Sequence, residues 1–97
     1  MKVEFHDEDM EAVLGTDSHR LRLPVTAVLA ARRAIQKLRA APSEKTLRGW
    51  KSFHYEKLQG DRRGFRSIRI NDQYRIVFKL VGGSDPKIII YEIGDYH

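Results

Sequence analysis

The segment 73–81 restricts the fold of this chain more than any other, because its alternate residues differ in chemistry. Tyr74, Ile76, Phe78 and Leu80 alternate with Gln73, Arg75, Val77 and Lys79. A period of two predicts a β-strand whose apolar side packs on a core. The opposite side then directs Arg75 and Lys79 outward, onto a sheet surface that the helices leave open.

Further segments with the composition of strands are 2–6, 52–58, 65–70 and 87–93. The isoleucine-rich segment 87–93 is expected to be central in the sheet, where both faces of a strand are covered. A tight turn at Asn71-Asp72 joins the segment 65–70 to the segment 73–81. Short turns of this kind predict antiparallel neighbours.

The strongest helical pattern covers 24–41. Its apolar stripe consists of Val28, Ala31, Ile35 and Leu38, joined by Val25 and Leu29. Shorter helical segments are predicted at 7–14, with Asp7 as N-cap, and at 43–47, with Ser43 as cap. The order of elements predicts a single α+β domain over residues 1–97, with a mostly antiparallel sheet and the N-terminal helices packed on one face.

The charge of the chain favours a polyanionic partner. The net charge is +5 with a pI near 9.7, the first eleven residues are mainly acidic, and in the segment 62–79 only Asp72 opposes the cations. Those between positions 62 and 79 are Arg62, Arg63, Arg66, Arg69, Arg75 and Lys79. The absence of cysteine excludes disulfides and thiolate chemistry. Neither a signal peptide nor a membrane span is expected, so we predict a cytoplasmic protein, and no residue spacing indicates a metal or another cofactor.

Arginines on an open sheet face can hold phosphates through paired N–H donors, and Arg69 is expected beside Arg75 there. The alternative is a solvated strand face whose charges oppose aggregation. The C-terminal Asp95-Tyr96-His97 adds groups suited to acid–base chemistry, unless it is a frayed tail. His54, on the predicted strand 52–58, is expected to approach the same surface.

The C-terminal half carries a set of motifs that together are quite specific. They are Leu58-Gln59-Gly60-Asp61, the run Ser67-Ile68-Arg69-Ile70-Asn71-Asp72-Gln73-Tyr74-Arg75, and the terminal Asp95-Tyr96-His97. This combination resembles the HigB branch of the RelE toxin superfamily, also called plasmid maintenance system killer proteins. The resemblance implies a RelE-like fold and an mRNA interferase that cuts messages in the ribosomal A site. It also implies a partner, a HigA-type helix-turn-helix antitoxin that supplies most of the contact to operator DNA.

The mechanism implied by the resemblance needs no metal. The ribose 2′-OH attacks the adjacent phosphate, which leaves a 2′,3′-cyclic phosphate and a 5′-OH. The resemblance assigns acid–base work or substrate orientation to His97 and Tyr96, an acidic position to Asp95, and phosphate stabilisation to Arg75. His54 is a further candidate for the site. The residues predicted to bind RNA phosphates are Arg69, Lys79, Lys57, Arg62, Arg63 and Arg66.

Two positions depart from the family pattern. Gln59 stands where many relatives have lysine, and Glu56 stands where some have histidine. A catalytically weak or inactive homologue that binds an antitoxin or RNA is therefore the main hypothesis that competes with the enzyme. Two further hypotheses are a DNA-binding protein that acts alone and a toxin that inhibits gyrase on a related fold.

Overall fold

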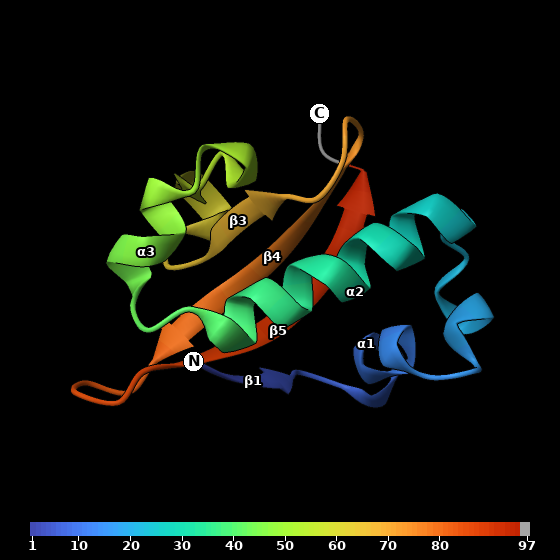
Figure 1. The fold of residues 1–97 in the computed structure, drawn as a ribbon, viewed down its shortest axis with the longest axis horizontal. Coiled ribbons are helices and arrows are strands. Elements are labelled where there is room, and N and C mark those ends of the chain that lie inside the picture. Colours follow the sequence, from blue (N-terminus) through green and yellow to red (C-terminus); the bar gives the residue numbers. More distant parts are fainter. Residues whose placement is uncertain (96–97) are drawn as a thin grey trace.

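The computed structural model describes residues 1–95, and it has a five-stranded sheet covered by helices on one face (Figure 1). The strands are β1 (Lys2–Phe5), β2 (Glu56–Lys57), β3 (Arg66–Arg69), β4 (Tyr74–Val81) and β5 (Lys87–Asp95), in the order β1-β5-β4-β3-β2. β1 is parallel to β5 and the other neighbours are antiparallel. The predicted α+β class is confirmed, although β4, and not the isoleucine-rich β5, is the middle strand.

The long helix α2 (Val25–Ala40) crosses the sheet over β4 and β5 (Figure 1). The shorter elements are α1 (Glu8–Glu11), α3 (Glu44–Gly49) and the 3-10 turns η1 (Ala12–Leu14), η2 (Ser18–Leu21), η3 (Lys51–Phe53) and η4 (Gly60–Arg62). Both predicted caps are present, since Asp7 Oδ1 accepts from Met10 N at 2.9 Å and Ser43 Oγ accepts from Thr46 N at 3.4 Å. No helix within residues 1–95 is long and apolar enough to cross a membrane.

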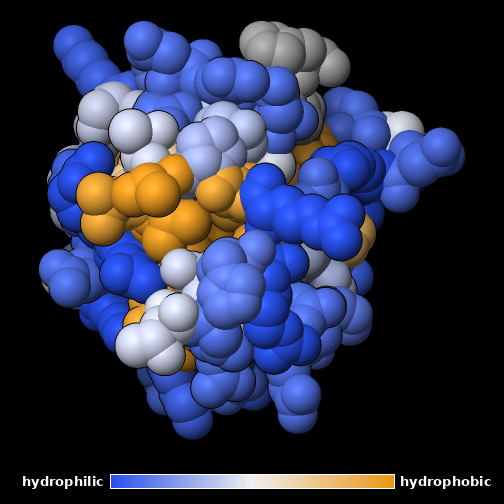
Figure 2. Space-filling model, turned by 90° about the vertical axis from the view of Figure 1, so that its right-hand side faces the viewer, coloured by the Kyte–Doolittle hydropathy of each residue, from blue (hydrophilic) through white to orange (hydrophobic). Residues whose placement is uncertain are grey.

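The core lies between α2 and the sheet. Ile76 and Phe78 of β4 are fully buried there, as the alternation of this strand predicts. They meet a stripe on α2 that contains the predicted Val28, Ala31, Ile35 and Leu38. Val25 and Leu29, predicted to join that stripe, instead have exposed fractions of 73% and 44%. They belong, with Leu14, to the exposed large hydrophobic residues, and Figure 2 shows an apolar patch on the end of the molecule where α2 begins.

The segment 52–58 is not the continuous strand that its composition predicts. Ser52 and Phe53 belong to η3, and His54 follows in a left-handed conformation with a φ of 44°. Phe53 is buried, and its ring meets the Trp50 ring edge-on with the two centroids 5.4 Å apart. Because the turn directs Phe53 into the core, pairing at the sheet edge is limited to Glu56–Lys57.

β5 contains a bulge that the residue pattern of this strand does not predict. The register with β4 shifts between Val77, which is opposite Glu92, and Phe78, which is opposite Ile90. Tyr91 is the extra residue, so Tyr91 and Glu92 both lie on the open face. The bulge lets Ile90 and Ile93 both enter the core, while the Glu92 carboxylate stays out of it.

The one-sided packing of β4 and α2 can be tested with matched truncations. We expect Ile76→Ala to lower the free energy of unfolding by about 2–5 kcal/mol, because it leaves a cavity beneath α2. Val25→Ala, on the exposed side of the same helix, should change it by no more than about 0.5 kcal/mol. Urea unfolding followed by circular dichroism measures both. Equal losses would contradict the assignment of faces.

Candidate active site

The open face of the sheet brings together side chains from several strands in registered rows. Arg69, Arg75 and Gly94 form one row across β3, β4 and β5. The next row consists of Glu56, Ser67, Val77 and Glu92, and the following one brings Lys79 beside Ile89. The prediction that Arg69 and Arg75 share a face is therefore confirmed, with Lys79 further along β4.

Arg75 is held by neighbours on two other segments. Its Nε donates to Ser67 Oγ at 3.0 Å, and its Nη2 donates to the carbonyl oxygen of His54 at 2.6 Å. The Glu56 carboxylate lies 3.7 Å from Nη2. The side chain is only 12% exposed, so its guanidinium has a fixed orientation at the edge of the open face. Ser67, fully buried, is a positioning residue that sequence analysis missed because a lone serine in a strand carries no motif.

Arg69 contacts the turn that follows β3. Its Nε donates to the carbonyl oxygen of Asn71 at 3.0 Å, and its Nη2 donates to Asp72 Oδ1 at 2.7 Å. The remaining nitrogen, Nη1, lies 3.5 Å from His54 Nε2. The turn itself is fixed by Asn71 Oδ1, which accepts from the backbone N–H groups of Gln73 and Tyr74.

His54 joins the site by a route that the sequence does not suggest. It is not on a strand, and its exposed side chain extends from the left-handed turn between η3 and β2. Arg75 binds its backbone carbonyl, while Arg69 contacts its ring. The two arginines thus place an imidazole beside the end of β3, at the same end of the sheet as Asp95.

The predicted terminal motif is described only in part. Asp95 is the last residue of β5 and lies opposite Tyr74, one position beyond the pair Arg75 and Gly94. Its Oδ2 accepts from Gln73 Nε2 at 2.8 Å. Tyr96 and His97 lie outside the described residues. The described part of β5 therefore ends at the same end of the sheet as Arg75.

The other predicted phosphate-binding residues do not form one cluster. Arg66 pairs with Phe78, so it lies on the helix-covered side, and its Nε contacts Glu44 at 2.9 Å. Lys57 pairs with Arg66 and lies on that side as well. Arg62 is on the open side, where it forms an ion pair with Glu92 at 3.0 Å, and Arg63 is exposed after η4.

The contact between Arg66 and Glu44 belongs to a small network that attaches α3 to the sheet. The Tyr55 hydroxyl donates to Glu44 Oε2, which also accepts from Arg66 Nε. The hydrogen bond from Tyr55, aided by Arg66 and opposed by burial, holds the pKa of Glu44 below its ordinary value. Burial and the same hydrogen bond raise the pKa of Tyr55. Because α3 and Tyr55 flank the His54 turn in sequence, this network supports the position of that turn.

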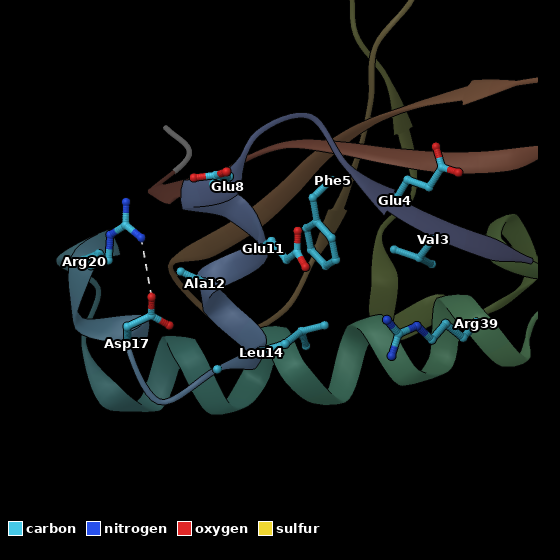
Figure 3. A pocket seen from close by; sticks show the side chains of 11 residues that line it. Val3, Glu4, Phe5, Glu8, Glu11, Ala12, Leu14, Asp17, Arg20 and Arg39 are labelled. Atoms are coloured by element: carbon cyan, nitrogen blue, oxygen red, sulfur yellow. Dashed lines mark hydrogen bonds and ion pairs between the residues drawn. The ribbon is translucent and has the colours of Figure 1, made fainter.

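A wide groove on another part of the surface has a different character. It lies between β1, the segment 8–17 and α2, and Figure 3 shows Glu8, Glu11 and Asp17 around it with Arg20 and Arg39. Acidic side chains outnumber basic ones there, which disfavours phosphate. Within residues 1–95, no group of three or more histidine, aspartate or glutamate side chains is arranged to hold a metal ion.

Comparison with known proteins agrees on one family. Residues 3–97 match the family model described as the RelE-like toxin of type II toxin-antitoxin system HigB. Toxin HigB-1 from Vibrio cholerae serotype O1 is 35% identical over 83 residues, which is 86% of this chain and 87% of that protein.

Solved structures share the fold at lower identity. A YoeB/ParE toxin from Agrobacterium tumefaciens aligns over 100% of both chains with a TM-score of 0.62 and 16% identity. YafQ from E. coli strain BL21(DE3) aligns over 97% of this chain and 91% of its own, with a TM-score of 0.63 and 13% identity. The YoeB-YefM complex from Staphylococcus aureus gives a TM-score of 0.56 and 18% identity over 100% of this chain and 97% of that chain.

The lowered pKa of Glu44 predicts a pH-dependent contribution to stability. A carboxyl with a lower pKa in the folded state stabilises the fold above its ordinary pKa of 4.5, and this contribution is lost as the pH falls through the folded value. We expect Glu44→Gln to cost about 1 kcal/mol at pH 7, because a neutral amide makes weaker hydrogen bonds, and to reduce the loss of stability between pH 5 and pH 3. Urea unfolding at several pH values measures this, with Glu8→Gln on exposed α1 as control. An unchanged pH profile for Glu44→Gln would contradict the role of this network.

Proposed function

The chain belongs to the HigB-like family of RelE-like toxins of type II toxin–antitoxin systems, and from this premise we propose that it is a ribosome-dependent endoribonuclease. Its substrate is messenger RNA in the ribosomal A site, and the place of action is the cytoplasm. The observation that carries this proposal is the cluster of Arg75, Arg69 and His54 on the open face. Planar guanidinium groups can bind a phosphate, and an imidazole beside them can transfer protons. This arrangement favours a catalytic site over a strand face whose charges only oppose aggregation.

The fixed orientation of Arg75 supports a role at the phosphate. Like charges directly opposite each other on a sheet destabilise it, yet Arg69 and Arg75 are cross-strand neighbours. Neutral oxygens of Ser67, His54 and Asn71 hold both side chains in place, and the carboxylates of Asp72 and Glu56 offset part of their charge. A bound phosphate would relieve the remaining repulsion, and more so once negative charge develops during attack.

The proposed reaction is an internal transesterification. A base accepts the proton of the ribose 2′-OH, the 2′ oxygen attacks phosphorus, and the bond to the 5′ oxygen breaks as an acid protonates that oxygen. Arg75 and Arg69 stabilise the pentacovalent phosphate. We assign the acid–base work to His97 and Tyr96, with Asp95 as the acidic group beside them. His54 is the second candidate for proton transfer, because its ring lies beside Arg69.

The proposed partner is a HigA-type helix-turn-helix antitoxin, as expected for the toxin of a type II system. The YoeB-YefM structure is that of a toxin with another protein of this kind of system, at an identity that supports likeness of fold alone. Contact with operator DNA is assigned to the antitoxin, because a helix-turn-helix motif is not evident in this chain.

The position of Glu56 supports a second candidate function. Its carboxylate lies 3.7 Å from Arg75, where it offsets part of the positive charge that a phosphate would use. Together with Gln59, this favours a weak or inactive homologue that holds RNA or an antitoxin without cutting. The two functions differ in whether new RNA ends appear.

The test is a pulse of expression in a bacterial host, followed by mapping of new mRNA 5′ ends. We expect cuts within translated codons for the wild type and none for His97→Ala. Arg75→Ala should reduce cutting by roughly 100-fold or more, the usual cost of losing a group that stabilises a developing oxyanion. Arg33→Ala, a change of a cation on α2, should cut like the wild type.

Thermal unfolding of each purified variant separates loss of chemistry from loss of fold, since Arg75 is largely buried. Arg69→Ala, at a more exposed arginine, gives a second measure of phosphate stabilisation. Soluble wild-type protein that produces no cuts would overturn the enzyme in favour of the binding module. In that event, cutting restored by Glu56→His would identify Glu56 as the cause.

A further inference from the structure

A cluster of aromatic rings lies on the open face at some distance from Arg75. The Tyr91 ring stacks on the His6 ring, with centroids 4.2 Å apart and planes inclined by 22°. The Phe65 ring meets Tyr91 edge-on at a centroid distance of 5.0 Å. The ammonium of Lys79 lies over both Phe65 and Tyr91, at 4.5 and 5.4 Å from their centroids. We call these four residues the ring cluster.

The ring cluster is not part of the core beneath α2. Its members come from β4, β5 and the segments that adjoin β1 and β3, and all of them remain at least partly exposed. The bulge in β5 gives the cluster its border, because it places Glu92 on the open face directly after Tyr91. Arg62 pairs with Glu92, and these residues line a hollow of about 280 Å³ together with Phe65 and Tyr91.

Stabilisation of the sheet accounts for only part of this arrangement. Aromatic pairs across strands contribute up to about 1.5 kcal/mol each, and they do so without a cation or an open hollow beside them. Surfaces that bind single-stranded nucleic acid combine exposed rings, on which bases stack, with cations that contact the backbone. The ring cluster has both, on the face that carries Arg69 and Arg75.

The spacing fits a short strand of RNA. Lys79 is four residues from Arg75 along β4, a distance of about 13 Å for an extended strand. Proteins that bind single strands typically contact about 4–16 nucleotides per domain. One strand of a few nucleotides therefore reaches both places.

We propose that the ring cluster is a nucleobase-stacking subsite, which holds an unpaired base of the RNA whose scissile phosphate lies at Arg75. The ligand is a base a few nucleotides from the cut, stacked on Tyr91 or Phe65 in the hollow beside the ion pair of Arg62 and Glu92. Lys79 contacts the adjoining phosphate. The inference rests on the proposed function for the identity of the strand, and it adds a second anchoring point for that strand.

The test uses the full chain with His97→Ala, so that RNA is bound without being cut. The probe is a fluorescent ten-nucleotide RNA, together with a set of the same RNA in which one base at a time is replaced by an abasic site. Loss of the stacked base should weaken binding by roughly 10-fold at one or two adjacent positions. Tyr91→Leu should abolish this dependence on position, and Tyr91→Phe should restore most of it.

Further variants separate stacking from charge and from folding. Lys79→Ala should weaken binding of every RNA in the set to a similar degree and reduce the dependence of affinity on salt. Leu29→Ala on α2 is the control outside the face and should bind like the parent. Urea unfolding midpoints for all variants identify any that are misfolded, and Phe65→Leu replaces Tyr91→Leu if that variant is.

The outcomes distinguish the subsite from the function on which it rests. RNA binding that is equally insensitive to abasic sites in the parent and in Tyr91→Leu overturns the subsite, while cuts mapped in cells leave the nuclease standing. A parent that binds no RNA overturns the subsite, and it overturns the nuclease as well if the chain produces no cuts in cells. Selective loss at one or two positions, removed by Tyr91→Leu, establishes the subsite even if the chain proves to be an inactive binder.

Discussion

The two-sided strand β4 is the feature on which the rest of the structure depends. Ile76 and Phe78 have no exposed surface because α2 covers them, and burial of side chains of this size contributes roughly 1.5–3 kcal/mol each. A chain of 97 residues has enough helix to cover only one face of its sheet. The other face is consequently free to carry Arg75 and Lys79 without the cost of burying charge in an apolar core.

The arginines on the open face form a site through hydrogen bonds, several of which join segments that are distant in sequence. Arg75 connects Ser67 on β3 with the backbone of His54, and Arg69 connects the same histidine with the turn before β4. The guanidinium group of each arginine is therefore already oriented by protein contacts before any ligand binds. Preorganised donors of this kind need little rearrangement when charge develops on a phosphate, which is the main source of electrostatic catalysis. Because of the same contacts, removal of Arg75 is expected to disturb both the site and the His54 turn.

Local sequence patterns predict much of the fold but little of the geometry of the site. The alternation of β4, the stripe of α2 and the caps Asp7 and Ser43 are set by neighbouring residues, so the sequence alone indicates them. The outward position of Arg69 and Arg75 follows from the same alternation.

The left-handed conformation of His54 could not be predicted from local sequence, because it depends on how Phe53 enters the core. The helical pattern wrongly predicts that Val25 and Leu29 are buried, because the sequence of a helix does not show which of its apolar residues another element covers. The pairing of Arg66 with Glu44 is separated by 22 positions, and no local pattern encodes it.

The bulge in β5 links the packing of the core to the layout of the open face. Strict alternation from Ile88 and Ile90 would direct the Glu92 carboxylate into the core and Ile93 out of it, an arrangement that costs free energy twice. One extra residue at Tyr91 corrects both positions, and it places the Glu92 carboxylate on the open face directly after the Tyr91 ring. A correction required for burial thus produces the border between the arginines and the ring cluster. Since β4 is continuous between Arg75 and Lys79, the distance between these two parts of the face is fixed by the strand itself. An RNA strand that contacts both would be held in one register relative to the scissile phosphate, which is the geometric condition for cutting at a defined position.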